Sequence, residues 1–399
     1  MTMLSKRRIR LGPAASGALF YFSFYGAAAA YVPFISVFYA DRGLSGSEIG
    51  VLAAIGPLMA LLAAPALTAL ADRKGLRRRL LVLSLAGTAL ALLVVPLPTS
   101  FVWLLPVVAL LSAVGSASIP LADGLIARTA ARRSLSYGKM RLWGSISWSV
   151  VATLGGLLWQ QAGFFTMFAV ASLFFLATIP YAGQLEEEVR PSDAQARPPL
   201  RLIMGDVRLR VVLLATLGLG TAMAAMFTFS AIYIAQIGGQ SLVGLFAGVM
   251  AISELPVMHW SERIMRGLGG PLTLVLAYSC FGIAYVGLAL IQSPVLLLGV
   301  AFLQGLGFGL FLPTTVRLFA DWAPAEWSST SQGILSAGLW GLAPLIAGPL
   351  GGIIYDNGGP TALFFASAGV IVVAGLVLVL AQLASVFSLK RETENVTRL

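Results

Sequence analysis

The chain is poor in charge, cysteine and histidine, and these shortages exclude several classes of protein. Only 11% of its 399 residues are charged and 58% are hydrophobic, whereas about a quarter of residues in soluble domains are charged. The mean hydropathy of +0.90 exceeds what a soluble fold of this size can bury. The lone cysteine, Cys280, excludes an intramolecular disulfide. The composition therefore indicates an integral membrane protein.

Motifs of the common enzymes are also missing. The sequence has no phosphate-binding loop, no zinc-ligand spacing and no helix-borne catalytic pair. The one histidine, His259, falls near the end of an apolar run, where packing at the membrane interface explains it better than a proton relay. We therefore expect no enzyme activity, no cofactor and no metal site.

Long apolar runs, separated by short charged or Pro/Gly-rich breaks, predict an all-α protein with about twelve transmembrane helices. Many runs reach the roughly 20 residues that a helix needs to cross about 30 Å of hydrocarbon. The first run is longer than the roughly 7–15 apolar residues of a signal peptide, so we expect it to be retained. The breaks place the helices at residues 14–40, 47–71, 80–98, 101–128, 138–160, 163–183, 209–236, 241–262, 269–291, 295–319, 328–354 and 359–386.

The basic residues test this helix map, because Lys and Arg concentrate in cytoplasmic loops. If the N-terminus is cytoplasmic, Arg42 is the only one of the 26 basic residues that lies on the outer side of the membrane. This pattern predicts cytoplasmic N- and C-termini in a plasma membrane, which in a bacterium is the inner membrane. The net charge of +10 then follows from orientation against anionic lipid, and nucleic acid is not an expected partner.

A polar stretch divides the predicted helices six and six. Residues 184–208 contain three consecutive acids and three prolines, which is typical of a cytoplasmic linker. The expected domains are a six-helix bundle at 1–183 and a second bundle with a short tail at 209–399. The runs 154–159 and 350–355 are similar and end the fifth and eleventh helices, which suggests duplication, although Gly/Leu-rich helices also match by chance. Two six-helix repeats resemble the plan of the major facilitator superfamily, in which substrate binds between the halves.

The loop at residues 71–78 resembles the signature that this superfamily carries between its second and third helices. Asp72, Arg73 and Gly75 stand at the signature's spacing, whereas Thr68 replaces a usual glycine. A carboxylate at a helix end can accept hydrogen bonds from basic groups and from a neighbouring helix N-terminus. We expect these three residues to latch the cytoplasmic side. An ordinary positively charged loop is the alternative.

A narrower resemblance covers most of the first half. Residues 26–34, 65–77 and 120–148 are similar to the lactose permease and its phenylpropionate- and nucleoside-carrier relatives. Asp123 and Arg141 are eighteen residues apart, and Trp148 follows seven residues later. In that branch an acid and an arginine at this spacing hold sugar hydroxyls, and the tryptophan stacks on the ring. The resemblance implies that the three residues bind substrate.

The residues themselves also favour a site. Arg141, Ser145 and Trp148 share one face of a helix. A lone acid such as Asp123 inside an apolar helix costs roughly 2.5–3.5 kcal/mol unless it faces a partner or water, and we expect Arg141 to be that partner. The alternative is a structural tie between two helices. Tyr25, in an aromatic set on the first helix, is a further candidate for stacking on a substrate ring, or else packs against lipid.

Glu254 is the only acid deep inside the second-half helices, roughly 12 Å from the nearest break at 1.5 Å per residue. Pro256 follows and weakens the helix there. A carboxyl group in apolar surroundings can carry a proton near neutral pH, and the position matches an acid that the permease branch uses for binding and coupling. The helix 10 His and Glu of that branch are missing here. We therefore expect Glu254 to carry the proton, with Asp123 as the competing candidate and a polar helix tie as the alternative.

Together these features predict a secondary transporter that works by alternating access. The favoured reaction is proton symport of a small neutral hydroxylated or ring-bearing solute, such as a sugar or nucleoside. The expected partners are that solute, protons and the lipid bilayer, and the chain is expected to be a monomer. Other readings stay open: a carrier of an aromatic carboxylate, an efflux carrier of drug-like compounds, and a non-transporting receptor or lipid-handling protein on the same fold.

Overall fold

The computed structural model describes residues 11–186, 205–323 and 328–387, and no strand occurs among them. Ser45 caps α3 in a reciprocal capping box with Glu48, and Pro13 opens α1 where its missing N–H costs nothing. The elements are α1 (Pro13–Tyr31), η1 (Val32–Phe34), α2 (Ile35–Asp41), α3 (Gly46–Lys74), α4 (Arg77–Val94), α5 (Phe101–Gly115), α6 (Ser118–Arg132), α7 (Tyr137–Ala182), α9 (Val207–Leu268), α10 (Gly270–Leu290), α11 (Pro294–Trp322), α12 (Ser328–Ala337), the π-helix η3 (Gly338–Leu342) and α13 (Ala343–Leu383).

Eight helices in the described ranges are long and apolar enough to cross a membrane. Three of the long ones each contain two helical stretches that meet at a kink, at Gly163 in α7, Gly239 in α9 and Gly359 in α13. Glycine permits these kinks because φ is positive at all three. The short helix α4 is not among the eight, since three arginines begin its 18 residues.

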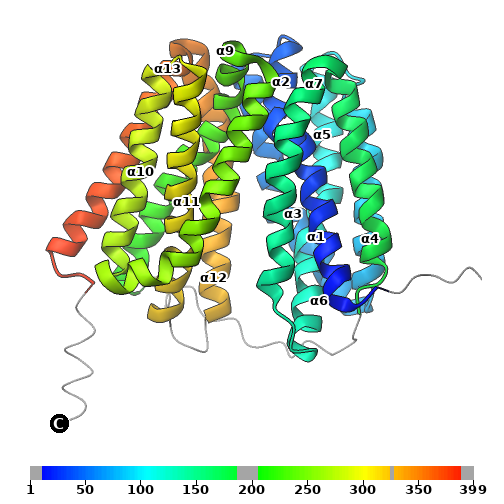
Figure 1. Ribbon diagram of the computed structural model, residues 1–399, viewed down its shortest axis with the longest axis horizontal. Coiled ribbons are helices and arrows are strands. Elements are labelled where there is room, and N and C mark those ends of the chain that lie inside the picture. The colour runs from blue at the N-terminus through cyan, green and yellow to red at the C-terminus, as the bar shows by residue number, and fades with distance from the viewer. Residues whose placement is uncertain (1–10, 187–204, 324–327, 388–399) are drawn as a thin grey trace, which may run out of the picture.

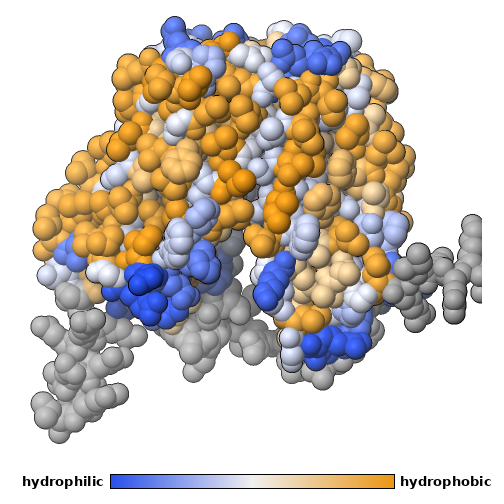
Figure 2. All heavy atoms as spheres, in the orientation of Figure 1, coloured by the Kyte–Doolittle hydropathy of each residue, from blue (hydrophilic) through white to orange (hydrophobic). Residues whose placement is uncertain are grey.

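The helices lie in two groups side by side. Figure 1 shows α1 to α7 on one side and α9 to α13 on the other. On the face shown in Figure 2, broad apolar surface covers the middle of both groups, and hydrophilic residues gather at the two ends. Large apolar side chains such as Leu83 and Trp103 are exposed, which suits lipid and not water. We call the end where α1 begins and α13 ends the proximal end, and the opposite end the distal end.

Glycines bring the two groups into backbone contact at the distal end. A methyl group on Gly50 of α3 would lie 2.0 Å from the carbonyl oxygen of Gly348 in α13, and one on Gly352 would lie 2.3 Å from that of Gly46. Gly244 of α9 approaches the backbone of α7 in the same way. Any side chain at these positions would overlap its neighbour, so the contacts require glycine. The distal end is closed, whereas the surfaces of the two groups part toward the proximal end (Figure 2).

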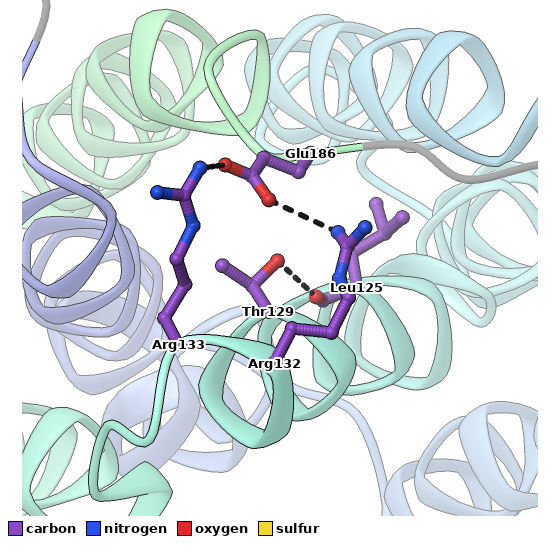
Figure 3. Close-up of polar contacts among 5 residues, drawn as sticks. All are labelled: Leu125, Thr129, Arg132, Arg133 and Glu186. Atoms are coloured by element: carbon purple, nitrogen blue, oxygen red, sulfur yellow. Dashed lines mark hydrogen bonds and ion pairs between the residues drawn. The ribbon is translucent and has the colours of Figure 1, made fainter.

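The expected linker at 184–208 lies mostly outside the described residues, as does the C-terminal tail from residue 388. Glu186 stands at the edge of that gap. It accepts hydrogen bonds from Nη2 of Arg132 at 3.0 Å and from Nη2 of Arg133 at 2.6 Å, and the Thr129 hydroxyl turns back to the Leu125 carbonyl of its own helix (Figure 3). The bridge ties the end of α7 to the end of α6, and its exposure limits its contribution to roughly 1 kcal/mol.

Candidate functional site

Asp123 of α6 lies among tyrosines. The Tyr21 hydroxyl of α1 donates to its Oδ1 at 2.5 Å and lies 3.1 Å from the hydroxyl of Tyr137 at the start of α7. Tyr21 is fully buried. Because little water competes there, this hydrogen bond is stronger than one at the surface. The acid thus has the polar partner that its depth requires, and the cluster joins three helices.

Arg141 of α7 contacts the same tyrosine face of α1. Its Nη2 donates to the Tyr25 hydroxyl at 2.5 Å, and its guanidinium carbon lies 4.0 Å from the Tyr25 ring centre and 5.4 Å from that of Tyr21. Such cation–π contacts favour the charged guanidinium. No ion pair joins Asp123 and Arg141 in this part of the structure, so the expected direct pairing is wrong. Tyr21 and Tyr25 are one helical turn apart on α1. The hydroxyl of Tyr21 donates a hydrogen bond to Asp123, and the ring of Tyr21 contacts the Arg141 guanidinium.

Ser145 and Trp148 continue the Arg141 face of α7, and both are half-buried. Trp148 packs against a buried cluster of Ala29 in α1, Ala152 in α7 and Ala247 in α9, which joins the two helix groups. Ser145 makes no hydrogen bond with another described residue. The role of this face in substrate binding stays a prediction.

A cavity of about 170 Å³ lies in the second group beside η1. Half-buried Glu254 of α9 and Gln304 of α11 supply polar groups in its wall, and Phe308 and Trp340 supply aromatic rings whose centres are 6.4 Å apart. α11 lies directly on α9 here, because Gly309 leaves no side chain between them and a methyl group on it would sit 2.8 Å from the Glu254 carbonyl oxygen. The close contact sets Glu254 and Gln304 in one wall.

Gln304 was not singled out by the sequence reading. It is 7% exposed, and its Nε2 has no hydrogen-bond partner among the described residues. A signal was present: Gln304 is the one polar side chain between Pro294 and Pro313. An amide isolated in an apolar membrane helix needs a partner for the same reason that an isolated acid does. Trp340 was also missed, because it belongs to the π-helical η3, a deviation that sequence periodicity does not reveal.

The two walls adjoin at the interface of the helix groups. Ala247 of α9 lines the cavity and belongs to the alanine cluster against which Trp148 of α7 packs. A second cavity, of about 460 Å³, lies beside α1 in the first group, and Phe227 of α9 lines both cavities. Over the described ranges, no group of three or more His, Cys, Asp or Glu side chains could hold a metal ion.

The expected latch residues lie at the proximal end. Nε of Arg77 donates to the Asp72 carboxylate, and Arg73 is exposed. Gly75 ends α3 with φ at +62°, a left-handed conformation that favours glycine. The bonds that fix this turn come from within the loop. In this conformation Asp72 therefore shapes the turn between α3 and α4, and its role as a latch between the helix groups remains a prediction.

A carboxylate does join the two groups at the distal end. Asp356, near the kink of α13, accepts hydrogen bonds from the backbone N–H of Gly46 at 2.6 Å, and from the N–H and hydroxyl of Ser47 at 2.8 Å and 2.6 Å. These donors form the N-terminus of α3, where the helix dipole favours an anion. Partial burial alone would raise the pKa of the Asp356 carboxyl, but the bonds from Ser47 and Gly46 outweigh it and lower that pKa. Sequence reading missed this contact, which spans 310 residues.

Comparison with known proteins agrees with this architecture. The family model described as "MFS_1 like family" matches residues 16–366. The chain is 28% identical over 365 residues to the maltose permease of Geobacillus stearothermophilus, covering 90% of this chain and 93% of that protein. It is 28% identical over 280 residues to a probable 3-phenylpropionic acid transporter of Escherichia coli, covering 66% and 70%.

A solved structure of the nucleoside transporter NupG, a D323A mutant, has the same fold. It superposes with a TM-score of 0.81 over 92% of this chain and 99% of that one, at 13% identity. A likeness at that identity concerns architecture alone, but the family match covers most of the sequence. The chain therefore belongs to the MFS_1-like family, within the major facilitator superfamily of membrane transporters.

Proposed function

We propose that the protein is a secondary active transporter that carries a small neutral hydroxylated or ring-bearing solute together with protons by alternating access. One observation carries the proposal: two acids and one base lie inside the helix groups, with Asp123 and Arg141 on α6 and α7 and Glu254 in the cavity wall of α9. Intramembrane charges are costly, and they are retained mainly where they bind substrates or ions. The names of the similar proteins refer to maltose, 3-phenylpropionic acid and a nucleoside; the first and third are neutral hydroxylated solutes, whereas the second is an aromatic acid.

The membrane topology belongs to this proposal. If each kinked helix crosses the bilayer twice and α4 crosses once, the described helices make twelve crossings. Residues 1–183 and 209–399 then form two six-helix bundles, with both termini and the 184–208 linker in the cytoplasm. The proximal end is cytoplasmic in this assignment, so the closed distal end makes the structure inward-facing. The protein acts as a monomer in the plasma membrane, which is the inner membrane of a bacterium.

Charge balance favours a neutral solute. Asp123 and Arg141 offset one another through the shared contact with Tyr21. A proton on Glu254 brings the sum of the three groups to zero, so a charged solute would add an uncompensated charge in a region of low dielectric constant. Arg141, Ser145, Trp148 and Tyr25 remain the proposed substrate contacts of the first group, and Glu254 the proton carrier.

The test is transport in proteoliposomes with purified full-length protein. We expect an imposed pH gradient, acidic outside, to drive accumulation of a neutral solute from a panel of maltose, uridine and lactose. A one-unit gradient supplies about 1.4 kcal/mol per proton, enough for roughly tenfold accumulation. Uptake of 3-phenylpropionate alone would overturn the neutral class in favour of an aromatic acid. Folded protein that binds solutes but moves none would make it a receptor.

A further inference from the structure

We infer that the cavity beside Glu254 and Gln304 binds the planar ring of a solute whose hydroxyl groups lie on a separate portion, as in a pyrimidine nucleoside. The inference rests on the proposed function. It narrows the proposed substrate class from sugars or nucleosides to nucleosides. The cavity's size, its few polar groups and its unpartnered amide each favour such a ring.

The volume of about 170 Å³ fits a single ring, with the rest of the solute outside the cavity. An apolar cavity of about 150 Å³ holds a benzene molecule, whereas a disaccharide or a fused two-ring base needs more space. Phe308 and Trp340 meet edge to face in the wall, with an interplanar angle of 63°. Met223 and Met226 also line the cavity, and thioethers adapt to an aromatic guest and contact its edge favourably.

The wall has too few polar groups to satisfy a sugar ring. The lining residues that carry polar groups are Glu254, Gln304, Ser230, Tyr285 and, through its indole N–H, Trp340, and apolar side chains make up the rest. A hexose carries a hydroxyl on most of its carbons, and each one buried without a partner weakens binding. A planar ring instead offers two apolar faces to aromatic side chains and carries its polar groups at the edge.

The unpartnered amide specifies what that edge must present. Nε2 of Gln304 is a donor that is buried without an acceptor among the described residues, which destabilises the protein unless a ligand supplies one. Glu254 can accept from an N–H of the same ligand. A carbonyl next to an N–H, the edge of a uracil ring, matches a donor and an acceptor held in one wall.

The opposite side of the interface suits the rest of the solute. Ala247 lines the cavity and belongs to the alanine cluster against which Trp148 packs, so the face of α7 that carries Arg141 and Trp148 adjoins the cavity. A carboxylate and a guanidinium bind hydroxyl groups with charge-assisted hydrogen bonds. The ring would therefore lie against α9 and α11, and the hydroxylated portion against α6 and α7.

The experiment measures uridine and maltose binding to purified full-length protein, by calorimetry and thermal shift, in wild type and two variants. Gln304→Leu removes the amide, and Thr314→Val is its matched control, because Thr314 also lies on α11 with a buried hydroxyl that lacks a partner among the described residues and it lines neither cavity. We expect both variants to melt at or above the wild-type temperature. Only Gln304→Leu should weaken uridine binding, by about tenfold.

The possible outcomes separate the inference from the proposed function. Equal uridine affinity in wild type and Gln304→Leu, or maltose bound in preference to uridine, overturns the inference but leaves a neutral-solute carrier standing. A wild type that binds neither probe while it transports 3-phenylpropionate overturns both. Weaker uridine binding in Gln304→Leu, with Thr314→Val at the wild-type value and proton-driven uridine uptake in wild type, supports both.

Discussion

The two walls of the central interface differ in how far their polar groups are already satisfied. In the wall formed by α1, α6 and α7, Asp123 and Arg141 both have hydrogen bonds from or to tyrosines. In the wall formed by α9 and α11, the Gln304 amide lacks a partner among the described residues and Glu254 faces a cavity. The wall of α1, α6 and α7 is held in one geometry by its hydrogen bonds before any ligand binds. The wall of α9 and α11 gains hydrogen bonds only when a ligand or proton binds. The difference suggests that the first wall positions the solute and the second couples it to the conformational change.

The largest effect is expected from Glu254→Gln, which fixes the neutral state while keeping volume and hydrogen bonding. Gradient-driven accumulation, roughly tenfold per pH unit in wild type, should vanish, while counterflow exchange of the same solute persists. Paired uptake and counterflow assays in proteoliposomes check this. Asp123→Asn is the comparison. If accumulation survives in Glu254→Gln and is lost in Asp123→Asn, the coupling belongs to the first wall.

The hydrogen bond from Tyr21 gives the next largest effect. Tyr21→Phe keeps the ring that Arg141 contacts but removes the donor to Asp123, so a poorly shielded carboxylate remains. Losing a hydrogen bond to a charged, buried group costs about 1.5–3 kcal/mol. We expect the KM for the solute to rise about tenfold or more.

Tyr278→Phe is the matched control for Tyr21→Phe, since Tyr278 is also buried and lies outside both cavities. Its uptake kinetics should equal those of wild type. Similar changes in KM for both variants would mean that the first wall is not positioned by Tyr21.

Asp356→Asn tests the contact that closes the distal end of the molecule. It weakens the bonds that hold α3 against α13 at the distal end, by about 1–2 kcal/mol, and should increase access from that side roughly tenfold. A single cysteine introduced at Ser230 in a Cys280→Ala background, labelled from outside, reports this access. Asn357→Asp, one residue further along, keeps the bonds and serves as the control.

The pH dependence of this contact follows from the lowered pKa of Asp356. A carboxyl whose pKa is lower in the closed state stabilises that state above its ordinary pKa, and the stabilisation is lost as pH falls through the lowered value. Glu48, near the same helix start, carries a charge of the same sign. Labelling of the wild type should therefore stay constant from pH 7 to about 5 and increase only below about pH 4.

The smallest effect is expected at Asp72. Its carboxylate is 39% exposed and pairs with Arg77 in the same loop. Exposed pairs contribute about 0–1 kcal/mol, so Asp72→Asn should slow transport less than about fivefold in the state seen here. A larger loss, with increased access from the proximal side, would show that Asp72 bonds across the helix groups in another conformation.

Much of the architecture could be predicted from the sequence because apolar length and breaks determine it locally. The helix expected at 47–71 is observed as Gly46–Lys74, and the break expected between 160 and 163 is the kink at Gly163. Eight candidate spans are found instead of twelve separate helices, because three kinks keep the chain helical where a loop was expected and because α4 is not counted among the spans. The single helix expected at 101–128 is observed as two helices, α5 and α6, which meet near Ser116. No break in hydropathy marks this position.

Contacts between distant segments could not be predicted. The spacing of Asp123 and Arg141 identified both residues, but their partners on α1 depend on how three helices pack. The link from Ser47 to Asp356 joins residues in opposite helix groups and has no local pattern. Gln304 was detectable in principle, since a lone amide in a membrane helix is as unusual as a lone acid.

The glycine contacts at the distal end have a consequence for trapping the protein in one state. Adding a single methyl group at Gly50 would place it 2.0 Å from the backbone of Gly348, which no side-chain rotation can relieve. The substitution would act as a steric wedge, acceptable only where α3 and α13 have separated. Gly50→Ala therefore offers a way to hold the protein open at its distal end, which is the outward-open state in the proposed topology. It does so without changing any proposed solute- or proton-binding group, and would capture a state that this structure does not represent.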